Sequence, residues 1–205
     1  MNREAHWQNV YTTKAPHAVS WFQPRAERSL RLIAEAGLPP EAPIIDIGAG
    51  ASLLVDELLA RGHRDVTLLD VSDAALTVTR TRLGAQAAGV TFVTGDVTTV
   101  ALPAARYALW HDRAVFHFLT AAAERAAYLA QLRHALAANG QIVIATFAED
   151  GPEKCSGLPV RRYSALALAA ELGADFELEV DEREQHATPF GTTQSFTYCR
   201  FRRRA

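Results

Sequence analysis

Short apolar segments alternate with longer amphipathic segments along the first three quarters of the chain. The short segments are rich in β-branched residues and predict five strands, over residues 42–47, 66–70, 90–94, 107–111 and 141–147. The longer segments predict helices, over residues 25–36, 51–61, 73–88 and 121–138. Strands that are separated by helices pair in parallel, so this pattern predicts βαβ units with helices on both faces of one sheet.

The alternation changes after residue 147. A polar loop over residues 149–162 and a helix over residues 164–172 precede two more strands, over residues 176–185 and 194–201. The segment between these strands is too short for a parallel crossover, so they should pair antiparallel. We therefore predict a single doubly wound α/β domain over residues 1–205, with five parallel strands and a C-terminal antiparallel hairpin.

Asn139 and Gly140 stand between the last of the four helices and the fifth strand. Both residue types adopt left-handed backbone conformations easily, and such a residue commonly ends a helix. We therefore expect this pair to be the helix stop.

Composition narrows the classes of partner. The chain has 21 Lys and Arg against 23 Asp and Glu, a formal net charge of −2, so we expect no attraction to nucleic acid or to an anionic membrane. Cys155 and Cys199 have neither metal-ligand spacing nor a disulfide pattern, which predicts a reducing compartment and no metal site. No apolar run resembles a signal sequence or a membrane span. We expect a cytoplasmic protein that is a monomer or a weak dimer.

The first predicted strand ends in a glycine-rich turn with the sequence DIGAGAS. Gly48 and Gly50 allow a sharp turn and a close approach of a ligand to the backbone. The third glycine of a dinucleotide-binding turn would fall at Leu53, whose bulk argues against a pyrophosphate. Asp46 would also disfavour a phosphate, whereas it could order the ammonium group of an amino-acid cofactor.

Two further carboxylates follow the next two strands. Asp70 lies about 20 residues beyond the glycine-rich turn, where an acidic residue accepts hydrogen bonds from ribose hydroxyls. Asp96 follows the third strand and could accept hydrogen bonds from the amino group of adenine. Asp70 could instead cap the next helix, but Ser72 and Asp73 are available for that role, and Asp96 could be a solvated turn residue. Together the strand-end carboxylates favour a nucleoside site.

The segments IIDIGAGAS, LLDVS and TGDV resemble, in this order, the glycine-rich, ribose and adenine motifs of class I methyltransferases that use S-adenosylmethionine (SAM). The resemblance covers about residues 42–147. It implies a Rossmann-like sheet of order 3-2-1-4-5-7-6 and SAM as the cofactor. The cofactor-binding residues that it implies in these segments are Asp46, Gly48, Ala49, Gly50, Asp70, Val71, Asp96 and Val97.

The fourth predicted strand runs into the sequence HDRAVFHF. This segment is similar to the strand-four segment of thiopurine and thiol methyltransferases, which implies that Asp112 contacts the cofactor and that Arg113 faces the methyl acceptor. We also expect His111 to contact the cofactor. Arg113 and Asp112 could alternatively form a structural ion pair. His111 or His117 could act as a general base, although a histidine among aromatic residues is often a packing residue.

Residues 1–24 precede the sheet and carry Trp7 and Trp21. They are similar to the N-terminal cap of bacterial small-molecule methyltransferases and of some enzymes that methylate protein lysines. The resemblance implies a cap over the active site, with Trp21 next to the sulfonium of the cofactor, where a cation–π contact is favourable. Either tryptophan could instead pack against the first helix.

These observations predict a SAM-dependent methyltransferase that acts on sulfur, nitrogen or oxygen of a small-molecule acceptor. The near-neutral charge and the lack of a recognition domain favour a small acceptor over a protein lysine. A doubly wound sheet could also belong to an oxidoreductase that binds NAD, or to a SAM-binding protein without catalytic activity. Leu53, Asp46 and the terminal hairpin argue against a nicotinamide cofactor.

Overall fold

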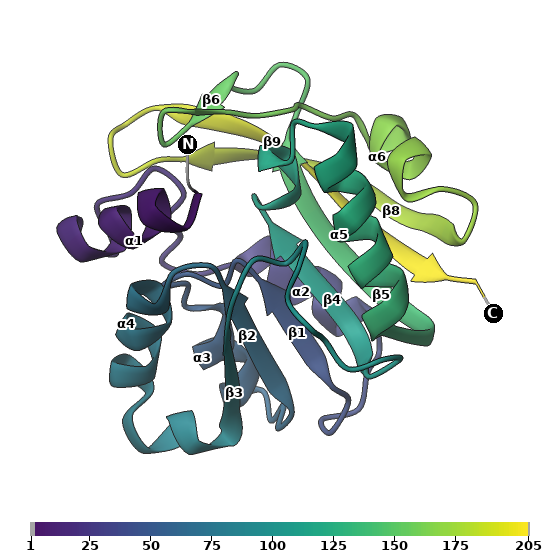
Figure 1. Ribbon diagram of the computed structural model, residues 1–205, viewed down its shortest axis with the longest axis horizontal. Coiled ribbons are helices and arrows are strands. Elements are labelled where there is room, and N and C mark those ends of the chain that lie inside the picture. Colours follow the sequence, from purple (N-terminus) through teal and green to yellow (C-terminus); the bar gives the residue numbers. More distant parts are fainter. Residues whose placement is uncertain (1–2, 205) are drawn as a thin grey trace.

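The computed structural model describes residues 3–204, so residues 1, 2 and 205 of the predicted domain lie outside it. Within that range, seven strands form one sheet: β1 (Ile44–Ile47), β2 (Val66–Asp70), β3 (Val90–Thr94), β4 (Tyr107–Arg113), β5 (Leu136–Phe147), β8 (Phe176–Ala187) and β9 (Thr193–Arg203). Their order is β3-β2-β1-β4-β5-β9-β8 (Figure 1). Strands β1 to β5 pair in parallel, and β9 is antiparallel to both of its neighbours. The predicted Rossmann-like sheet, including its order, is confirmed.

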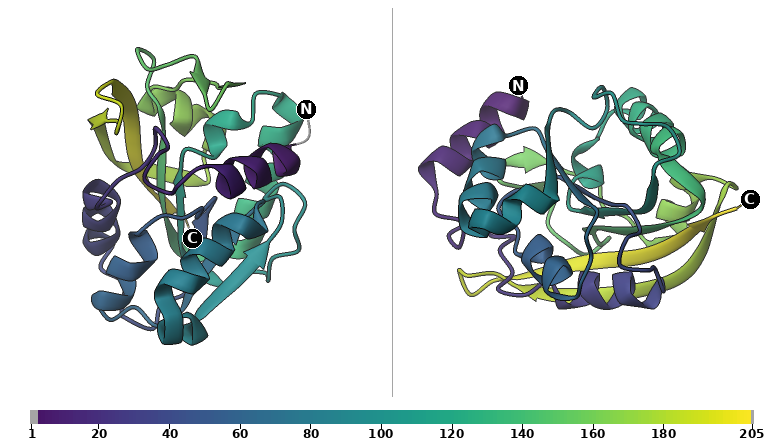
Figure 2. Two further views of the ribbon diagram at one scale, coloured as in Figure 1. Left: turned by 90° about the vertical axis from the view of Figure 1, so that its left-hand side faces the viewer. Right: turned by 90° about the horizontal axis from the view of Figure 1, so that it is seen from below.

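The helices of the described range are α1 (Arg3–Thr13), α2 (Glu27–Glu35), α3 (Leu54–Ala60), α4 (Asp73–Leu83), α5 (Ala122–Ala135) and α6 (Ala165–Leu172). Two short 3₁₀ helices, η1 (Gly84–Gly89) and η2 (Phe116–Phe118), follow α4 and β4. Helices α2, α3 and α4 pack on one face of the sheet, and α5 and α6 pack on the other (Figure 2).

Successive strand residues point to opposite faces, which divides the core in two. In β1, Ile44 packs with Leu30 of α2, whereas its neighbour Ile45 packs with Tyr128 of α5. All four β1 residues are buried, because this central strand is covered on both sides. The sheet therefore holds the residues that follow β1, β2 and β4 on a rigid edge.

The predicted helix stop at Asn139 and Gly140 is wrong. Helix α5 ends at Ala135, and Leu136 already belongs to β5, where it pairs with Tyr107. Asn139 has a φ of 59° and lies in β5 near an irregularity of the β4–β5 pairing. A Cβ at position 140 would lie 2.7 Å from the Leu136 Cγ. Glycine is needed there because the backbone packs against a buried leucine, not because a helix ends.

Two elements lie where the sequence predicts none. Residues 3–13 form α1, whose polar and apolar residues do not separate into two faces, so helical periodicity gives no signal. The predicted loop before α6 contains a small hairpin of β6 (Lys154–Cys155) and β7 (Leu158–Pro159). Both elements lie near the carboxyl ends of the parallel strands, as Figure 1 shows. None of the helices in residues 3–204 is long and apolar enough to cross a membrane.

Candidate active site

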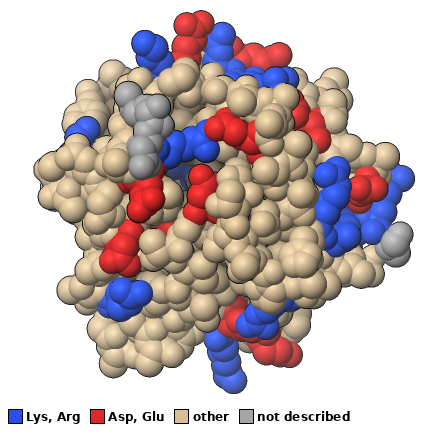
Figure 3. Space-filling view, in the orientation of Figure 1, with Lys and Arg blue, Asp and Glu red and all other residues tan. Residues whose placement is uncertain are grey.

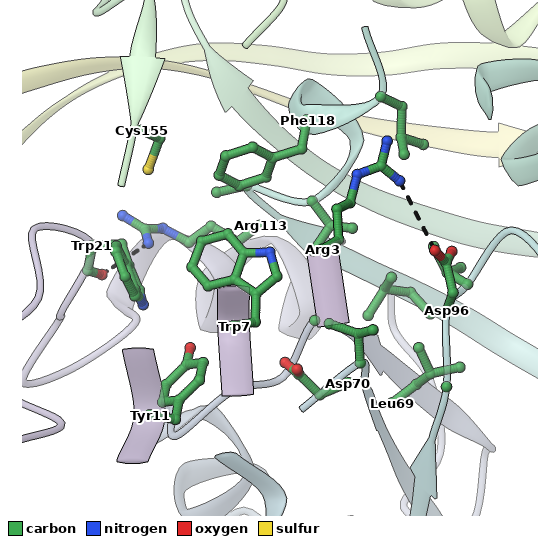
Figure 4. A pocket seen from close by; sticks show the side chains of 18 residues that line it. Arg3, Trp7, Tyr11, Trp21, Leu69, Asp70, Asp96, Arg113, Phe118 and Cys155 are labelled. Carbon is green, nitrogen blue, oxygen red and sulfur yellow. Dashed lines mark hydrogen bonds and ion pairs between the residues drawn. The ribbon is translucent and has the colours of Figure 1, made fainter. Parts of the chain in front are cut away.

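A cavity lies at the carboxyl edge of the sheet, where doubly wound folds bind their ligands. With its open mouth it encloses about 790 Å³ between protein atoms, within the range of small-molecule sites. Strand ends supply Ile47, Gly48, Leu69, Asp70, Val71, Gly95, Asp96, Val97, Arg113, Ala114, Val115, Phe118 and Leu119. The segments outside the parallel strands supply Arg3, Trp7, Tyr11, Trp21 and Cys155. Figure 4 shows side chains from both groups facing each other across the cavity.

The glycine-rich turn after β1 forms the floor of the cavity. Gly48 has a φ of 62°, and a Cβ there would overlap the side chain of Val115. Gly50 has a φ of 55°, and a Cβ there would overlap the hydroxyl of Tyr11. Both positions require glycine for two reasons, the left-handed backbone and the close neighbour. Gly48 lines the cavity, whereas Gly50 lies beneath Tyr11 and does not.

Asp70 ends β2 beside this turn. Its carboxylate oxygens accept hydrogen bonds from the backbone N–H groups of Gly50 and Ser72, each at 2.8 Å. Burial raises the pKa of Asp70 to about 6, and these hydrogen bonds oppose the shift because they favour the charged form. The Ser72 hydroxyl caps α4 by accepting from Ala75, as expected, so Asp70 does not serve as the cap. Asp70 lines the cavity, so its carboxylate lies next to the space that a ligand would fill.

Asp96 and Val97 lie after β3, at the far end of the cavity from the Gly48 turn. One Asp96 oxygen accepts from the backbone and the hydroxyl of Thr98, at 2.8 and 2.7 Å. The other oxygen lies 3.9 Å from a guanidinium nitrogen of Arg3, which also pairs with Glu124 (Figure 4). Helix α1 is thus tied to the same carboxylate that the sequence assigns to adenine.

Asp46 lies on the other side of the Gly48 turn, in a second hollow. Its Oδ1 atom is 2.6 Å from His111 Nδ1, and the other ring nitrogen of His111 is 2.9 Å from the Ser29 hydroxyl. Ala49 lines this hollow too, and Gly48, Tyr11, Trp21 and Arg113 line both spaces. The predicted cofactor residues are thus divided into a group around Asp70 and Asp96 and a group around Asp46, joined at Gly48.

Asp112 and His117 line neither space. Asp112 is fully buried and accepts from Val115 N, Phe116 N and the Tyr128 hydroxyl, at 2.9, 3.1 and 2.6 Å. Burial raises the pKa of Asp112 to about 6. The carboxylate shapes the turn after β4 and is not brought next to the other predicted residues.

His117 is packed between two phenylalanine rings, those of Phe118 and Phe147. Its Nδ1 atom accepts a hydrogen bond from the backbone N–H of Phe147 at 3.2 Å. Burial lowers the pKa of His117 to about 3, so the ring is neutral at ordinary pH. The structure therefore places this predicted general base among packing residues.

Arg113 reaches from the end of β4 between the two spaces. Its Nε atom donates to the Tyr198 hydroxyl at 2.8 Å, and its Nη1 atom donates to the Trp21 carbonyl at 3.1 Å. The guanidinium also lies 4.6 Å from the centre of the Phe196 ring and 4.0 Å from Glu184. Arg113 is not paired with Asp112. It holds the Trp21 segment against the C-terminal hairpin.

Helix α1 supplies the residues that sequence reasoning missed. The Trp7 ring lies edge to face with Trp21 and Phe118, with ring centres 5.5 and 5.2 Å apart. The Gln8 side chain accepts from the Ser72 hydroxyl at 2.9 Å, which fixes α1 to the start of α4. No strand-end pattern marks these residues, because their place in the site depends on the tertiary position of α1.

The cavity fits SAM on this structure's own features. The backbone of the Gly48 turn lines the cavity, and Asp70 and Asp96 offer carboxylates at consecutive strand ends. Aromatic rings of α1 and the Trp21 segment suit a sulfonium, since their faces attract cations. The described residues contain no group of three His, Cys, Asp or Glu side chains that could hold a metal ion.

Comparisons with known proteins agree with this fit. Residues 44–140 match the family model of a methyltransferase domain. No curated protein matches the chain significantly. A structure from work on the conversion of a disulfide bond into a thioacetal group during echinomycin biosynthesis superposes with a TM-score of 0.79, at 18% identity over 99% of this chain and 93% of that one.

Two further solved structures are similar. The 1,6-didemethyltoxoflavin-N1-methyltransferase of Burkholderia thailandensis, which holds 1,6-didemethyltoxoflavin and S-adenosylhomocysteine, has a TM-score of 0.71 and 25% identity over 96% of this chain and 82% of its own. A SAM-dependent methyltransferase of Anabaena variabilis has a TM-score of 0.74 and 17% identity, over 98% and 93%.

Residues 44–140 thus form a methyltransferase domain, and the fold is that of enzymes that use S-adenosylmethionine. Its cofactor is S-adenosylmethionine.

Proposed function

We propose that the enzyme methylates sulfur, nitrogen or oxygen of an uncharged, planar small molecule. The observation that carries this proposal is the set of edge-to-face rings that lines the cavity, those of Trp7, Trp21 and Phe118. Aromatic rings favour flat partners that can stack or meet their edges. The Burkholderia methyltransferase, whose bound acceptor is 1,6-didemethyltoxoflavin, provides a precedent in this fold.

We assign the cofactor site to the residues on the floor. In this proposal Asp70 accepts the ribose hydroxyls, Asp96 and the backbone of Val97 accept the adenine edge, and Asp46 holds the ammonium end. When bound, SAM supplies a methyl carbon made electrophilic by the positively charged sulfur. The enzyme's own contribution is to align the acceptor with that carbon and to exclude water. In favourable cases, alignment alone lowers the activation barrier by about 7–11 kcal/mol.

We infer that no side chain of the cavity acts as a strong base. Both ring nitrogens of His111 are already hydrogen-bonded, and the neutral His117 lies outside the cavity. Burial raises the pKa of Cys155 to about 12, so its thiol is neutral too. We therefore assign His111 and Arg113 to positioning. Water takes the proton of the acceptor if one is released.

A protein lysine is the competing acceptor, since aromatic rings also attract an ammonium group. The guanidinium of Arg113 lines the same cavity and repels a second cation. On the face in Figure 3, acidic and basic side chains stand next to each other, without one large patch of a single sign for a charged macromolecule. These features favour the uncharged small molecule.

Radiolabelled SAM incubated with a cell extract that has been separated by size tests the proposal. We expect label in the small-molecule fraction, in an extractable compound with ultraviolet absorbance. The Trp7→Leu variant should raise the acceptor KM several-fold with a smaller effect on the affinity for S-adenosylhomocysteine. Label confined to macromolecules would overturn the proposal, and an Asp70→Asn control should reduce labelling of any fraction.

A further inference from the structure

A chain of buried polar side chains runs along the second hollow of the active site. It begins at Asp46, whose carboxylate contacts His111 Nδ1 at 2.6 Å, and continues from His111 Nε2 to the Ser29 hydroxyl at 2.9 Å. The Ser29 side chain interacts with the hydroxyl of Tyr198. That hydroxyl accepts a hydrogen bond from Arg113 Nε at 2.8 Å. One continuous path thus joins two residues of the site that are far apart in sequence.

The groups along this path can all be hydrogen-bonded at the same time. Arginine can only donate and a carboxylate can only accept, so the path has a donor at the Arg113 end and an acceptor at the Asp46 end. The Tyr198 and Ser29 hydroxyls and the His111 ring lie between them, and each of these groups can both donate and accept. Hydrogen-bond chains of this kind strengthen cooperatively.

The order Ser29–His111–Asp46 is that of a hydrolase triad, but hydrolysis does not follow. The Ser29 side chain lies in the first turn of α2, with 0% of the residue exposed. Although Ser29 borders the second hollow, its oxygen is not exposed to an approaching substrate carbonyl. The chain is therefore a connection between sites rather than a nucleophile with its base.

Four members of the chain line the hollow next to Gly48, where we place the ammonium end of the cofactor at Asp46; they are Asp46, His111, Ser29 and Arg113. At the other end, Arg113 donates to the Trp21 carbonyl at 3.1 Å. Trp21 contacts the rings of Trp7 and Tyr11, which line the acceptor side. The chain thus links the cofactor's amino-acid end to the aromatic wall.

We propose that Ser29 and Tyr198 are positioning residues that couple binding of the cofactor's ammonium group at Asp46 to ordering of the Trp21 segment. A cation held by Asp46 fixes the rotamers along the chain, so Arg113 then holds Trp21 at a smaller entropic cost. The coupling is reciprocal, because an ordered Trp21 segment raises the affinity of Asp46 for the ammonium group by the same factor. The inference does not depend on which acceptor is methylated.

Two ligands separate the coupling from simple cofactor binding. S-adenosylhomocysteine carries the amino-acid end, whereas 5′-methylthioadenosine has the same nucleoside and sulfur without it. By calorimetry, Ser29→Ala and Tyr198→Phe should weaken S-adenosylhomocysteine about threefold to tenfold, the effect of one hydrogen bond, and leave 5′-methylthioadenosine unchanged. Tyr128→Phe is the matched control: it removes another buried tyrosine hydroxyl, outside the chain, and should leave the ratio of the two affinities unchanged.

Hydrogen exchange gives a second measurement, which needs no variant. In the wild type, S-adenosylhomocysteine should slow amide exchange over residues 17–23 more than 5′-methylthioadenosine does at equal saturation. In Tyr198→Phe this difference should disappear. Equal protection by both ligands in the wild type overturns the proposal, as does an equal loss of affinity for both ligands in Ser29→Ala and Tyr198→Phe. These outcomes leave the assignment of a small-molecule acceptor untouched.

Discussion

Replacing Asp70 by asparagine removes one negative charge from the floor of the active site with almost no change of shape. In the wild type, the backbone N–H groups of Gly50 and Ser72 each donate to one carboxylate oxygen. In the proposed cofactor site, both oxygens also accept from the ribose hydroxyls. Asparagine keeps only one oxygen. The variant therefore loses a hydrogen bond to a charged acceptor, a contribution of about 1.5–3 kcal/mol. The dissociation constant of SAM should rise by about tenfold to 150-fold.

The pH dependence of SAM binding gives a second test of the role of Asp70. Burial raises the pKa of Asp70 to about 6, and only the ionised carboxylate can accept from both hydroxyls. The wild type should therefore bind SAM most tightly above pH 7 and about tenfold more weakly at pH 5, because most Asp70 side chains are then protonated. Asp70→Asn has no charge to lose at this position, so its affinity should change much less with pH.

Calorimetric titration with SAM between pH 5 and pH 8 measures both effects. Asp73→Asn is a matched control, since it makes the same change three residues away, on an exposed side chain that lines no cavity. Its affinity curve should follow the wild type. If Asp70→Asn bound SAM like the wild type at pH 8, or fell in parallel with it toward pH 5, Asp70 would not be the ribose acceptor.

Two further predictions concern the scaffold. Gly48→Ala should lower the free energy of unfolding, measured with urea, by about 1–3 kcal/mol more than Gly37→Ala does. Both glycines have positive φ, but only an alanine at position 48 would meet a neighbouring side chain. Equal losses of stability would show that Gly48 is not sterically confined. His117→Asn keeps an acceptor for the Phe147 N–H but removes the ring. The pKa of His117 is lowered to about 3, so its neutral ring supports folding fully above pH 6.5 and progressively less as the pH falls, when the unfolded chain takes up the proton. The advantage of the wild type over this variant should therefore shrink by about 2 kcal/mol between pH 7 and pH 5 in urea unfolding, and a constant difference would contradict the buried neutral state.

The central sheet could be predicted because the burial of each strand is visible in its local pattern of apolar residues. Strands such as β1 and β2 are buried on both faces, so they read as continuous apolar runs that end in a polar residue. The hairpin of β8 and β9 followed from a connection too short for a crossover. Boundaries were harder, as β5 shows: its first residue, Leu136, pairs with Tyr107 of β4 although Asn139 and Gly140 resemble a helix stop.

The site was predictable only where a residue is placed by the strand that precedes it. Gly48, Asp70 and Asp96 follow parallel strands, so their meeting at one edge is a consequence of the fold. Their partners were not predictable in this way. Arg3 reaches Asp96 from a helix at the other end of the sequence, and no local pattern sets that distance.

The sheet, the class of cofactor and the strand-end carboxylates could be predicted from the amino-acid sequence, because backbone periodicity and parallel pairing are local rules that each segment obeys. Tertiary structure alone decided that Tyr11 covers Gly50, that Arg113 holds Trp21 and that His111 lies between Asp46 and Ser29. These contacts join distant segments through side-chain packing, whose geometry is fixed only when the whole core has formed.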